Sequence, residues 1–287
     1  MKNKRKVNST GVGLGLHARR ILAYVVLIIV SFFCLFWFYV LFVNATRSNS
    51  NLQSGFSVLP SSNLLSNWKH LLEKSGLPVI QGMLNSLIIS TCSAVVCVYF
   101  STMTAYAIHV YDFKLKKFIY PFILAVMMIP TQVTALGFVN LVSDMNLEDS
   151  FIPLIIPQIA VPITFFYMKQ YMESSLPLSL VEAARIDGSG EFRTFNHIVL
   201  PLMKPAIAVQ AIFTFVSSWN NYFIPALILH DDSKKTLPIL IAQLRAADWL
   251  KFDMGQVYIM IAFSIFPVIV VYLILSKHIV QGVALGS

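Results

Sequence analysis

Residues 177–201 read PLSLVEAARIDGSGEFRTFNHIVLP and lie between two long apolar stretches of the chain. A Ser-x-x-Glu capping box at Ser179 predicts a short helix that begins at Leu180, and Gly188 should end it. Apolar residues at helical spacing predict a second short helix after the glycine. They are Phe192, Phe195, Ile198 and Val199. We therefore expect two short helices, joined at a glycine, on the surface from which both apolar stretches emerge.

The composition of the chain is that of an integral membrane protein. Hydrophobic residues make up 57% of the 287 residues and charged residues 12%, whereas soluble domains have about 45–50% and about 25%. With a mean hydropathy of +0.72, too few charged side chains are present to solvate a globule of this size. This composition excludes a disordered chain, a disulfide scaffold and an ordinary cytosolic enzyme.

Six stretches of the sequence are long and apolar enough to cross a membrane as helices. They are residues 21–43, 86–109, 118–142, 151–168, 205–229 and 257–276. The first exceeds the roughly 7–15 apolar residues of a cleavable signal peptide, so we expect it to be retained as an anchor. The expected fold class is therefore an all-α membrane protein with six transmembrane helices, which places both termini on one side.

Basic residues predict which side that is. Of the 21 Lys and Arg residues, 14 fall on the side of the termini and 7 on the opposite side, and with the acidic residues the net charges are +9 and −1. Because basic loops stay in the cytoplasm, both termini are expected to be cytoplasmic. The net charge of +8 is thus explained by topology, and we expect no nucleic-acid partner.

This topology divides the chain into successive parts. They are a basic cytoplasmic leader (1–20), the first transmembrane helix (21–43), an external loop (44–85), a core transmembrane domain of five helices (86–276) that contains a cytoplasmic loop (173–204), and a cytoplasmic tail (277–287).

The sequence also limits the chemistry that the chain can perform by itself. No Asp, Glu, Lys or Arg lies in the middle of a predicted span, which disfavours an ion-coupled transporter. The chain has no Gly-x4-Gly-Lys-Ser/Thr loop for ATP, and its three cysteines lie inside spans without metal-ligand spacing. We therefore expect no catalytic residue, metal or cofactor on this chain, and any energy must come from another chain.

Uncharged polar residues follow one stripe of the fifth predicted span. Gln210, Thr214, Ser217 and Asn221 occupy positions i, i+4, i+7 and i+11, with Trp219 and Asn220 beside them. One interpretation is a pathway that hydrogen-bonds a polar, uncharged solute and stacks an aromatic ring on it. The alternative is helix packing, in which polar side chains bond between helices. Prolines within the spans, among them Pro130 and Pro267, favour kinked helices, which suit a gated pathway.

The 177–201 segment resembles the EAA motif of the membrane subunits of bacterial ABC importers. Glu182-Ala183-Ala184, Gly188 and the closing Ile198-Val199-Leu200-Pro201 match this motif in residue type and spacing. Asp187 and Trp219-Asn220 are similar to the carbohydrate branch, the MalG-type permeases. The resemblance covers about residues 60–287 and implies the MetI-like transmembrane domain.

The resemblance implies that the loop is a coupling helix that docks on a cytoplasmic ATPase subunit. The residues it assigns to coupling are Glu182, Ala183, Ala184, Asp187, Gly188, Ile198, Leu200 and Pro201. The implied partners are two MalK-like ATPase subunits that hold ATP and Mg, a homologous MalF-like second permease, and an extracellular or periplasmic solute-binding protein. The predicted outer loop comprises residues 230–256. In this loop, Arg245, Asp248 and Trp249 could contact that binding protein, although an ordinary solvated loop is the alternative.

The function expected on this basis is that of a non-catalytic permease subunit in the bacterial cytoplasmic membrane, which moves a sugar or short oligosaccharide. One alternative keeps the importer but changes the solute to a sugar phosphate or polyol. Another is a membrane assembly or receptor protein that transports nothing and uses the cytoplasmic loop only to recruit a partner.

Overall fold

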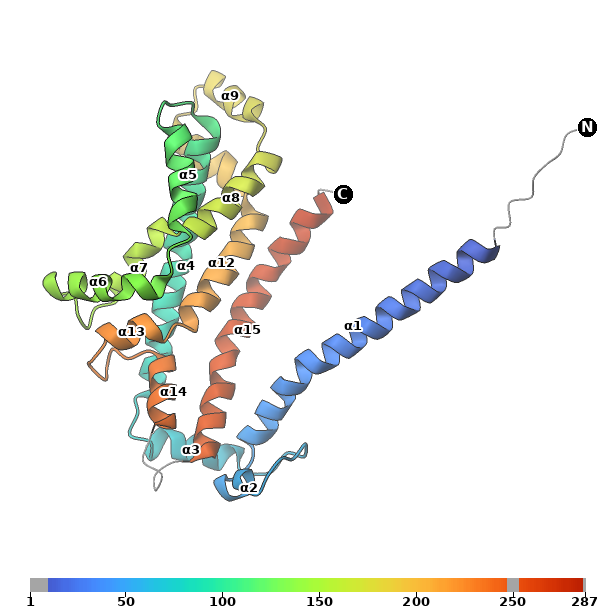
Figure 1. The fold of residues 1–287 in the computed structure, drawn as a ribbon, viewed down its shortest axis with the longest axis vertical. Helices are drawn as coiled ribbons and strands as arrows, with labels where there is room; N and C mark the ends of the chain where they lie inside the picture. The colour runs from blue at the N-terminus through green and yellow to red at the C-terminus, as the bar shows by residue number, and fades with distance from the viewer. Residues whose placement is uncertain (1–9, 247–252, 286–287) are drawn as a thin grey trace, which may run out of the picture. The chain divides into compact units, whose positions relative to one another are not determined.

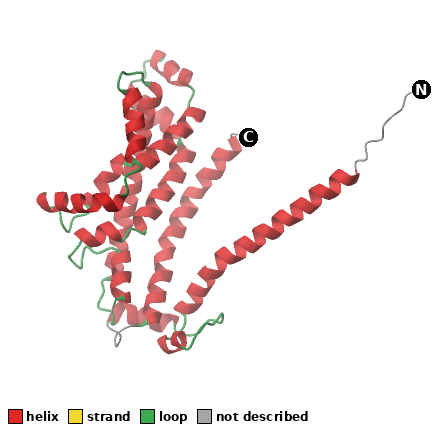
Figure 2. Cartoon of the chain, in the orientation of Figure 1, coloured by secondary structure: helices red, strands yellow, loops and turns green. Residues whose placement is uncertain are grey.

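The computed structural model describes residues 10–246 and 253–285, within which the secondary structure is helical and no strand occurs (Figures 1 and 2). The chain divides into two compact units. One comprises Met1–His70 with Asp253–Ala262, and the other comprises Leu71–Phe252 with Phe263–Ser287. Helices α3 (Leu64–Glu73) and α15 (Met254–Leu285) contribute residues to both units.

The first unit contains the long helix α1 (Thr10–Ala45) and the short helix α2 (Asn49–Gln53). The described side chains of α1 between residues 19 and 35 are exposed in the isolated chain, as expected of an apolar helix that faces lipid or a partner. The end of α1 is fixed by Asn67, a buried residue of α3. Its Nδ2 atom donates hydrogen bonds to the carbonyl oxygens of Ala45 and Arg47, both at 2.9 Å.

The second unit is built around α4 (Val79–Val110), which packs on α8 (Pro162–Ser175) and α12 (Lys204–Trp219). Small residues form one buried stripe of α4 and allow the close approach of these helices. They are Ser86, Ser90, Ser93, Cys97 and Ser101. The other α-helices of the unit are α5 (Lys116–Val126), α6 (Thr131–Asp144), α7 (Ile152–Ile155), α9 (Leu178–Ile186), α10 (Glu191–Thr194), α11 (Leu200–Leu202), α13 (Phe223–Ile228) and α14 (Leu237–Arg245). A 3₁₀ helix, η1 (Ile156–Ala160), lies between α7 and α8, and a π-helix, η2 (Phe195–Val199), lies between α10 and α11.

The six expected spans are not all single helices. In the third, α5 ends at Val126 and α6 begins at Thr131, because Pro130 adopts the extended conformation that precedes α6. Figure 1 shows α6 turned away from the direction of α5. Pro267, in contrast, lies within the unbroken helix α15.

Within the described residues, four helical segments are long and apolar enough to cross a membrane, and a bent pair could supply a fifth. The four are Arg19–Ala45, Val79–Val110, Ile152–Ser175 and Met254–Lys277. The bent pair joins Glu191–Leu202 to Lys204–Trp219 at an angle of 81°. The structure therefore supports a helical membrane protein, while the number of six spans stays a prediction.

Candidate functional site

The first candidate site is the segment that carries the EAA motif, which forms α9 and the turns after it. Helix α9 begins at Leu178, and Pro177 is its N-cap without a side-chain cap hydrogen bond. The predicted capping box is therefore wrong. Pro177 has φ −64° and its carbonyl accepts the first bond, from the N–H of Leu180, so Ser179 lies inside the first turn. Glu182 is exposed and has no hydrogen bond or ion pair among the described residues.

Gly188 ends α9 as predicted. The N–H of Gly188 bonds to the carbonyl of Arg185 at 3.0 Å, and the N–H of Ser189 bonds to the carbonyl of Ala184 at 2.9 Å. These two bonds form a Schellman motif, which requires a left-handed residue after the helix. Gly188 supplies it with φ +76°.

After Gly188, the segment continues as α10, a π-helical turn from Phe195 to Val199, and α11. Phe195 and Val199 are buried as the apolar spacing predicts, but Phe192 is 71% exposed. Val181 of α9 belongs to the same apolar cluster as Phe195 and Val199. One face of α9 is thereby fixed to the helices of the unit.

The residues assigned to coupling divide between that fixed face and the free surface. Ala184 is buried, while Ile198 and Leu200 are half-buried. The exposed members are Glu182, Ala183, Asp187, Gly188 and Pro201. Sequence reasoning missed the neighbouring Ile186, which is 86% exposed and continues the free surface of α9. The sequence feature that could have identified Ile186 was its place as an apolar residue between the charged residues Arg185 and Asp187.

An ion-pair network that the sequence analysis did not identify fixes the position of α9. Arg185 Nε lies 2.7 Å from Glu191 Oε1, and Glu191 Oε2 accepts hydrogen bonds from the hydroxyls of Tyr106 and Tyr111. The Arg185 guanidinium also lies over the ring of Tyr111, 5.4 Å from its centroid. The hydrogen bonds from Arg185 and Tyr111 hold the pKa of Glu191 below its ordinary value. The network joins α9 and α10 to the end of α4.

The second candidate site is a cavity of about 860 Å³ within the same unit. Four residues of the polar stripe line it, namely Gln210, Thr214, Ser217 and Asn221. Other polar side chains come from elements distant in sequence. They are Ser86, Thr134, Gln158, Thr164, Tyr167, Ser218 and Thr236. No charged residue occurs among the described lining residues, so the cavity is suited to an uncharged, hydrogen-bonding solute.

Trp219 and Asn220 do not line this cavity. The Trp219 side chain is 3% exposed and stacks on Phe215, with ring centroids 5.7 Å apart and an interplanar angle of 16°. Asn220 is exposed and forms the C-cap of α12. Gln158 and Tyr167, which sequence reasoning missed, come from the segment that Pro157 and Pro162 interrupt. Those prolines, with a glutamine between them, were the available signal.

At the other end of α4, hydrogen bonds fix the chain between α13 and α14. Asn85 Nδ2 donates to the carbonyl oxygens of Ser233 and Lys235, both at 2.9 Å. Ser86 Oγ accepts from the N–H of Leu237 at 2.8 Å. Asn85 and Ser86 thus hold the beginning of α14.

The predicted contact residues for a binding protein follow α14. Arg245 is the last residue of α14 and is exposed, whereas Asp248 and Trp249 lie outside the described residues. Asp149, from the segment between α6 and α7, accepts bonds from the N–H groups of His230 and Asp231 at 2.6 and 2.7 Å. These bonds hold the pKa of Asp149 below its usual value.

Comparison with known proteins identifies the family. Residues 98–285 match the family described as binding-protein-dependent transport system inner membrane component. The arabinooligosaccharides transport system permease protein AraQ of Bacillus subtilis (strain 168) is 35% identical over 206 residues, which cover 71% of each chain. The sn-glycerol-3-phosphate transport system permease protein UgpE of Yersinia pestis bv. Antiqua (strain Antiqua) is 31% identical over 267 residues, 91% of this chain and 95% of UgpE.

A solved structure shows the same fold. It is a chain of a bacterial ABC transporter involved in the import of the acidic polysaccharide alginate, with a TM-score of 0.77 and 22% identity over 96% of this chain and 99% of that chain. The all-helical fold is therefore the MetI-like fold of ABC permeases. Together with the family match over residues 98–285, it shows that this chain is a membrane permease of the binding-protein-dependent ABC transporter family.

Proposed function

We propose that this chain is the permease subunit of an ATP-driven importer for a sugar or short oligosaccharide in the bacterial cytoplasmic membrane. The observation that carries the proposal is the free surface of α9, where Glu182 has no partner among the described residues and Ile186 is 86% exposed. Leu178, Leu180 and Phe192 of the same segment are also exposed, and a group of exposed apolar side chains is typical of a protein interaction surface. The partner that fits is a cytoplasmic ATPase subunit, since the family depends on ATP hydrolysis by other chains.

The coupling residues fit this role in two different ways. Glu182, Ala183 and Asp187 would contact the ATPase subunit directly, because they are exposed on α9. Gly188 would set the turn that follows, and Ala184 would hold α9 to the permease. Ile198, Leu200 and Pro201 would support α9 and the turn after it from within the permease. Two ATPase subunits with ATP and Mg, a second permease and an external solute-binding protein complete the proposed assembly.

The proposed translocation pathway includes the cavity lined by Gln210, Thr214, Ser217 and Asn221. Hydroxyl and amide groups in an uncharged cavity can exchange hydrogen bonds with sugar hydroxyls without the cost of burying a charge. Trp219, which stacks on Phe215, would act by supporting this wall. Arg245, Asp248 and Trp249 are proposed contacts for the binding protein on the outer side.

The proposed topology has six spans and cytoplasmic termini. The net charges of +9 and −1 on the two sides support it. Three of the six spans would be broken helices, with breaks near Pro130, Val161 and Asn220. Broken helices are tolerated at membrane depth where protein or a cavity surrounds them.

A sugar phosphate is the second candidate substrate, and the similarity to UgpE, named as an sn-glycerol-3-phosphate permease, favours it. The uncharged cavity lining favours the neutral sugar, because a phosphate would require a cation or helix N-terminus in this chain or in its partner. Uptake into proteoliposomes that contain the whole transporter decides between the two. A neutral arabino-oligosaccharide should be taken up and sn-glycerol-3-phosphate should not compete, and the reverse result would favour the phosphate.

The coupling role has its own test. Glu182→Lys should abolish the stimulation of ATP hydrolysis by loaded binding protein, because it reverses the charge on the free surface of α9. Glu148→Lys is the matched control, since Glu148 is also exposed but lies before α7 rather than on α9. Equal stimulation in wild type and Glu182→Lys would refute the assignment of α9 to coupling.

A further inference from the structure

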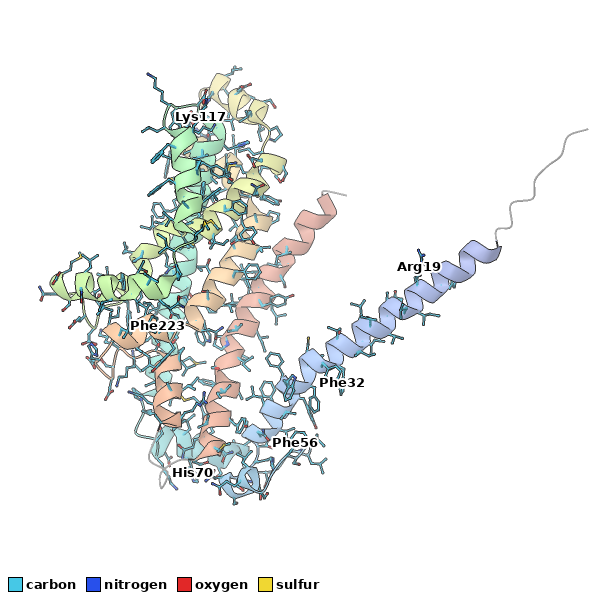
Figure 3. The ribbon with its side chains drawn as sticks, viewed as in Figure 1. Arg19, Phe32, Phe56, His70, Lys117 and Phe223 are labelled. Atoms are coloured by element: carbon cyan, nitrogen blue, oxygen red, sulfur yellow. The ribbon has the colours of Figure 1, made fainter. Side chains whose placement is uncertain are left out.

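A second cavity, of about 870 Å³, lies where α4 ends, α5 begins and α8 passes beside them. Four lysines line it, namely Lys114, Lys116, Lys117 and Lys169, together with Asp112 and Tyr120. We call this cavity the lysine pocket. Figure 3 shows Lys117 at the same end of its unit as α9. The transport function proposed above gives this pocket no role.

Two of the lysines are held in place by the protein. Lys116 Nζ donates a hydrogen bond to the carbonyl of Tyr111 at 3.0 Å. Lys169 Nζ forms an ion pair with Glu173 and lies 4.4 Å from the centroid of the Tyr120 ring. These contacts fix two positive charges in the wall of the pocket.

The other two lysines have no partner among the described residues. Lys114 and Lys117 line the pocket and are exposed, and the carboxylate of Asp112 is the acidic group in the described lining. The pocket therefore has an excess of positive charge and two free ammonium groups. An ammonium group is a strong binder of phosphate as a point charge.

Exposed aromatic and aliphatic side chains that do not line the pocket lie next to its lysines along the chain. Leu115 and Phe118, which stand next to its lysines, are 63% and 67% exposed, and Phe122 one turn further along α5 is 56% exposed. The rings of Phe118 and Phe122 stack with centroids 5.9 Å apart. A soluble anion would use only the lysines, whereas an amphiphile with an anionic head and apolar chains would use both groups.

We propose that the lysine pocket binds the headgroup of an anionic phospholipid, whose acyl chains cover Phe118 and Phe122. Basic pockets between membrane helices recognise anionic headgroups in this way. The pocket lies at the end of α4 that is proposed to face the cytoplasm, so the lipid would come from the cytoplasmic leaflet. The inference depends on insertion in a membrane and not on the transported solute.

The test measures lipid binding to the full chain in its purified transporter complex, with dioleoyl-phosphatidylglycerol and dioleoyl-phosphatidylcholine as probes. Wild type should prefer phosphatidylglycerol. Lys114→Gln/Lys117→Gln should weaken its binding about 30-fold, because each lysine near the headgroup contributes about a fivefold factor. Lys114→Arg/Lys117→Arg should retain the preference, which controls for folding.

A matched variant separates the pocket from general surface charge. Lys204→Gln/Lys277→Gln removes two exposed lysines that lie outside the pocket on the same proposed side of the membrane. This variant should bind phosphatidylglycerol as wild type does. An equal loss in both double variants would overturn the proposal, and so would an equal affinity of wild type for the two lipids.

Two further measurements distinguish other occupants of the pocket. Inorganic phosphate should not displace the lipid at millimolar concentration, and Phe118→Ala/Phe122→Ala should weaken lipid binding. Displacement by phosphate, with no effect of the two phenylalanines, would show a site for a free anion instead. Loss of the ATPase subunits from Lys114→Gln/Lys117→Gln, without any lipid preference in wild type, would show a protein contact. These binding results do not depend on whether the complex transports a sugar.

Discussion

Gly188 offers the sharpest test of how the loop after α9 works. Its φ of +76° closes the Schellman motif, and a Cβ atom built on it would meet no atom within 4 Å. A substitution at this position therefore changes the backbone energy and introduces no clash. Gly190, two residues later, also has open space around it, but its φ of −69° suits any residue.

The two glycines allow the same substitution to give opposite results. An L-residue in the left-handed region costs about 1–2 kcal/mol, so Gly188→Ser should reduce the population of the native turn about 5- to 30-fold relative to competing turns. Gly190→Ser should be neutral or slightly favourable, because Gly190 is the N-cap of α10 and serine is a preferred N-cap residue. Gly188→Asn should recover part of the loss, since asparagine tolerates the left-handed conformation.

The assay is a titration of ATPase subunits onto proteoliposomes that contain the permease pair, with ATP hydrolysis stimulated by loaded binding protein as the readout. Gly188→Ser should raise the concentration of ATPase subunits needed for half-maximal stimulation about 5- to 30-fold. Gly190→Ser should leave it within about twofold. The reasoning is refuted if Gly188→Ser matches wild type, or if Gly188→Asn is as impaired as Gly188→Ser.

Three other predictions concern the remaining contacts. Asn85→Ala should lower the free energy of unfolding of the solubilised protein by about 1–3 kcal/mol, because two part-buried hydrogen bonds are lost, and the exposed Asn220→Ala serves as a neutral control. Asn221→Leu should reduce uptake several-fold while Asn220→Leu does not, since only Asn221 lines the cavity; equal effects would exclude the cavity as the pathway. Glu191→Gln should speed amide hydrogen exchange in residues 178–190 at neutral pH. In wild type the same acceleration should occur only as the pH falls below the ordinary carboxyl range, because a lowered pKa gives stability that is lost when Glu191 is protonated.

The sequence predicted the elements with local causes and missed those that depend on distant residues. The stop at Gly188 follows from one residue type and was confirmed. The start of α9 was wrong by two residues, because the fixed φ of Pro177 outweighed the Ser179 capping signal. The apolar character of residues 118–142 predicted a single span, although Pro130 separates two helices there. A run of apolar residues cannot show where a chain turns between neighbours.

The candidate sites show the same limit. Helical spacing identified the cavity wall from Gln210 to Asn221, but spacing within one helix cannot show which neighbour covers an adjacent residue. Trp219 was therefore expected in the pathway, whereas Phe215, one turn earlier, stacks on it. Gln158 joins the same cavity from a segment some 50 residues away. The pair of Arg185 and Glu191 was missed because the turn at Gly188 brings them together.

Helix α4 connects these features into one mechanical unit. It has 32 residues, a length of about 48 Å at 1.5 Å per residue. At one end, Tyr106 and the adjoining Tyr111 hold Glu191 of α10, and at the other end Asn85 holds the chain before α14. Ser86 lines the cavity. If an ATPase subunit displaces α9 as proposed, we expect α4 to transmit that displacement to the chain before α14, because rigid helices carry coupling between distant sites. Glu191→Gln should therefore weaken the response of ATP hydrolysis to the binding protein even though Glu191 touches neither the cavity nor the outer loop.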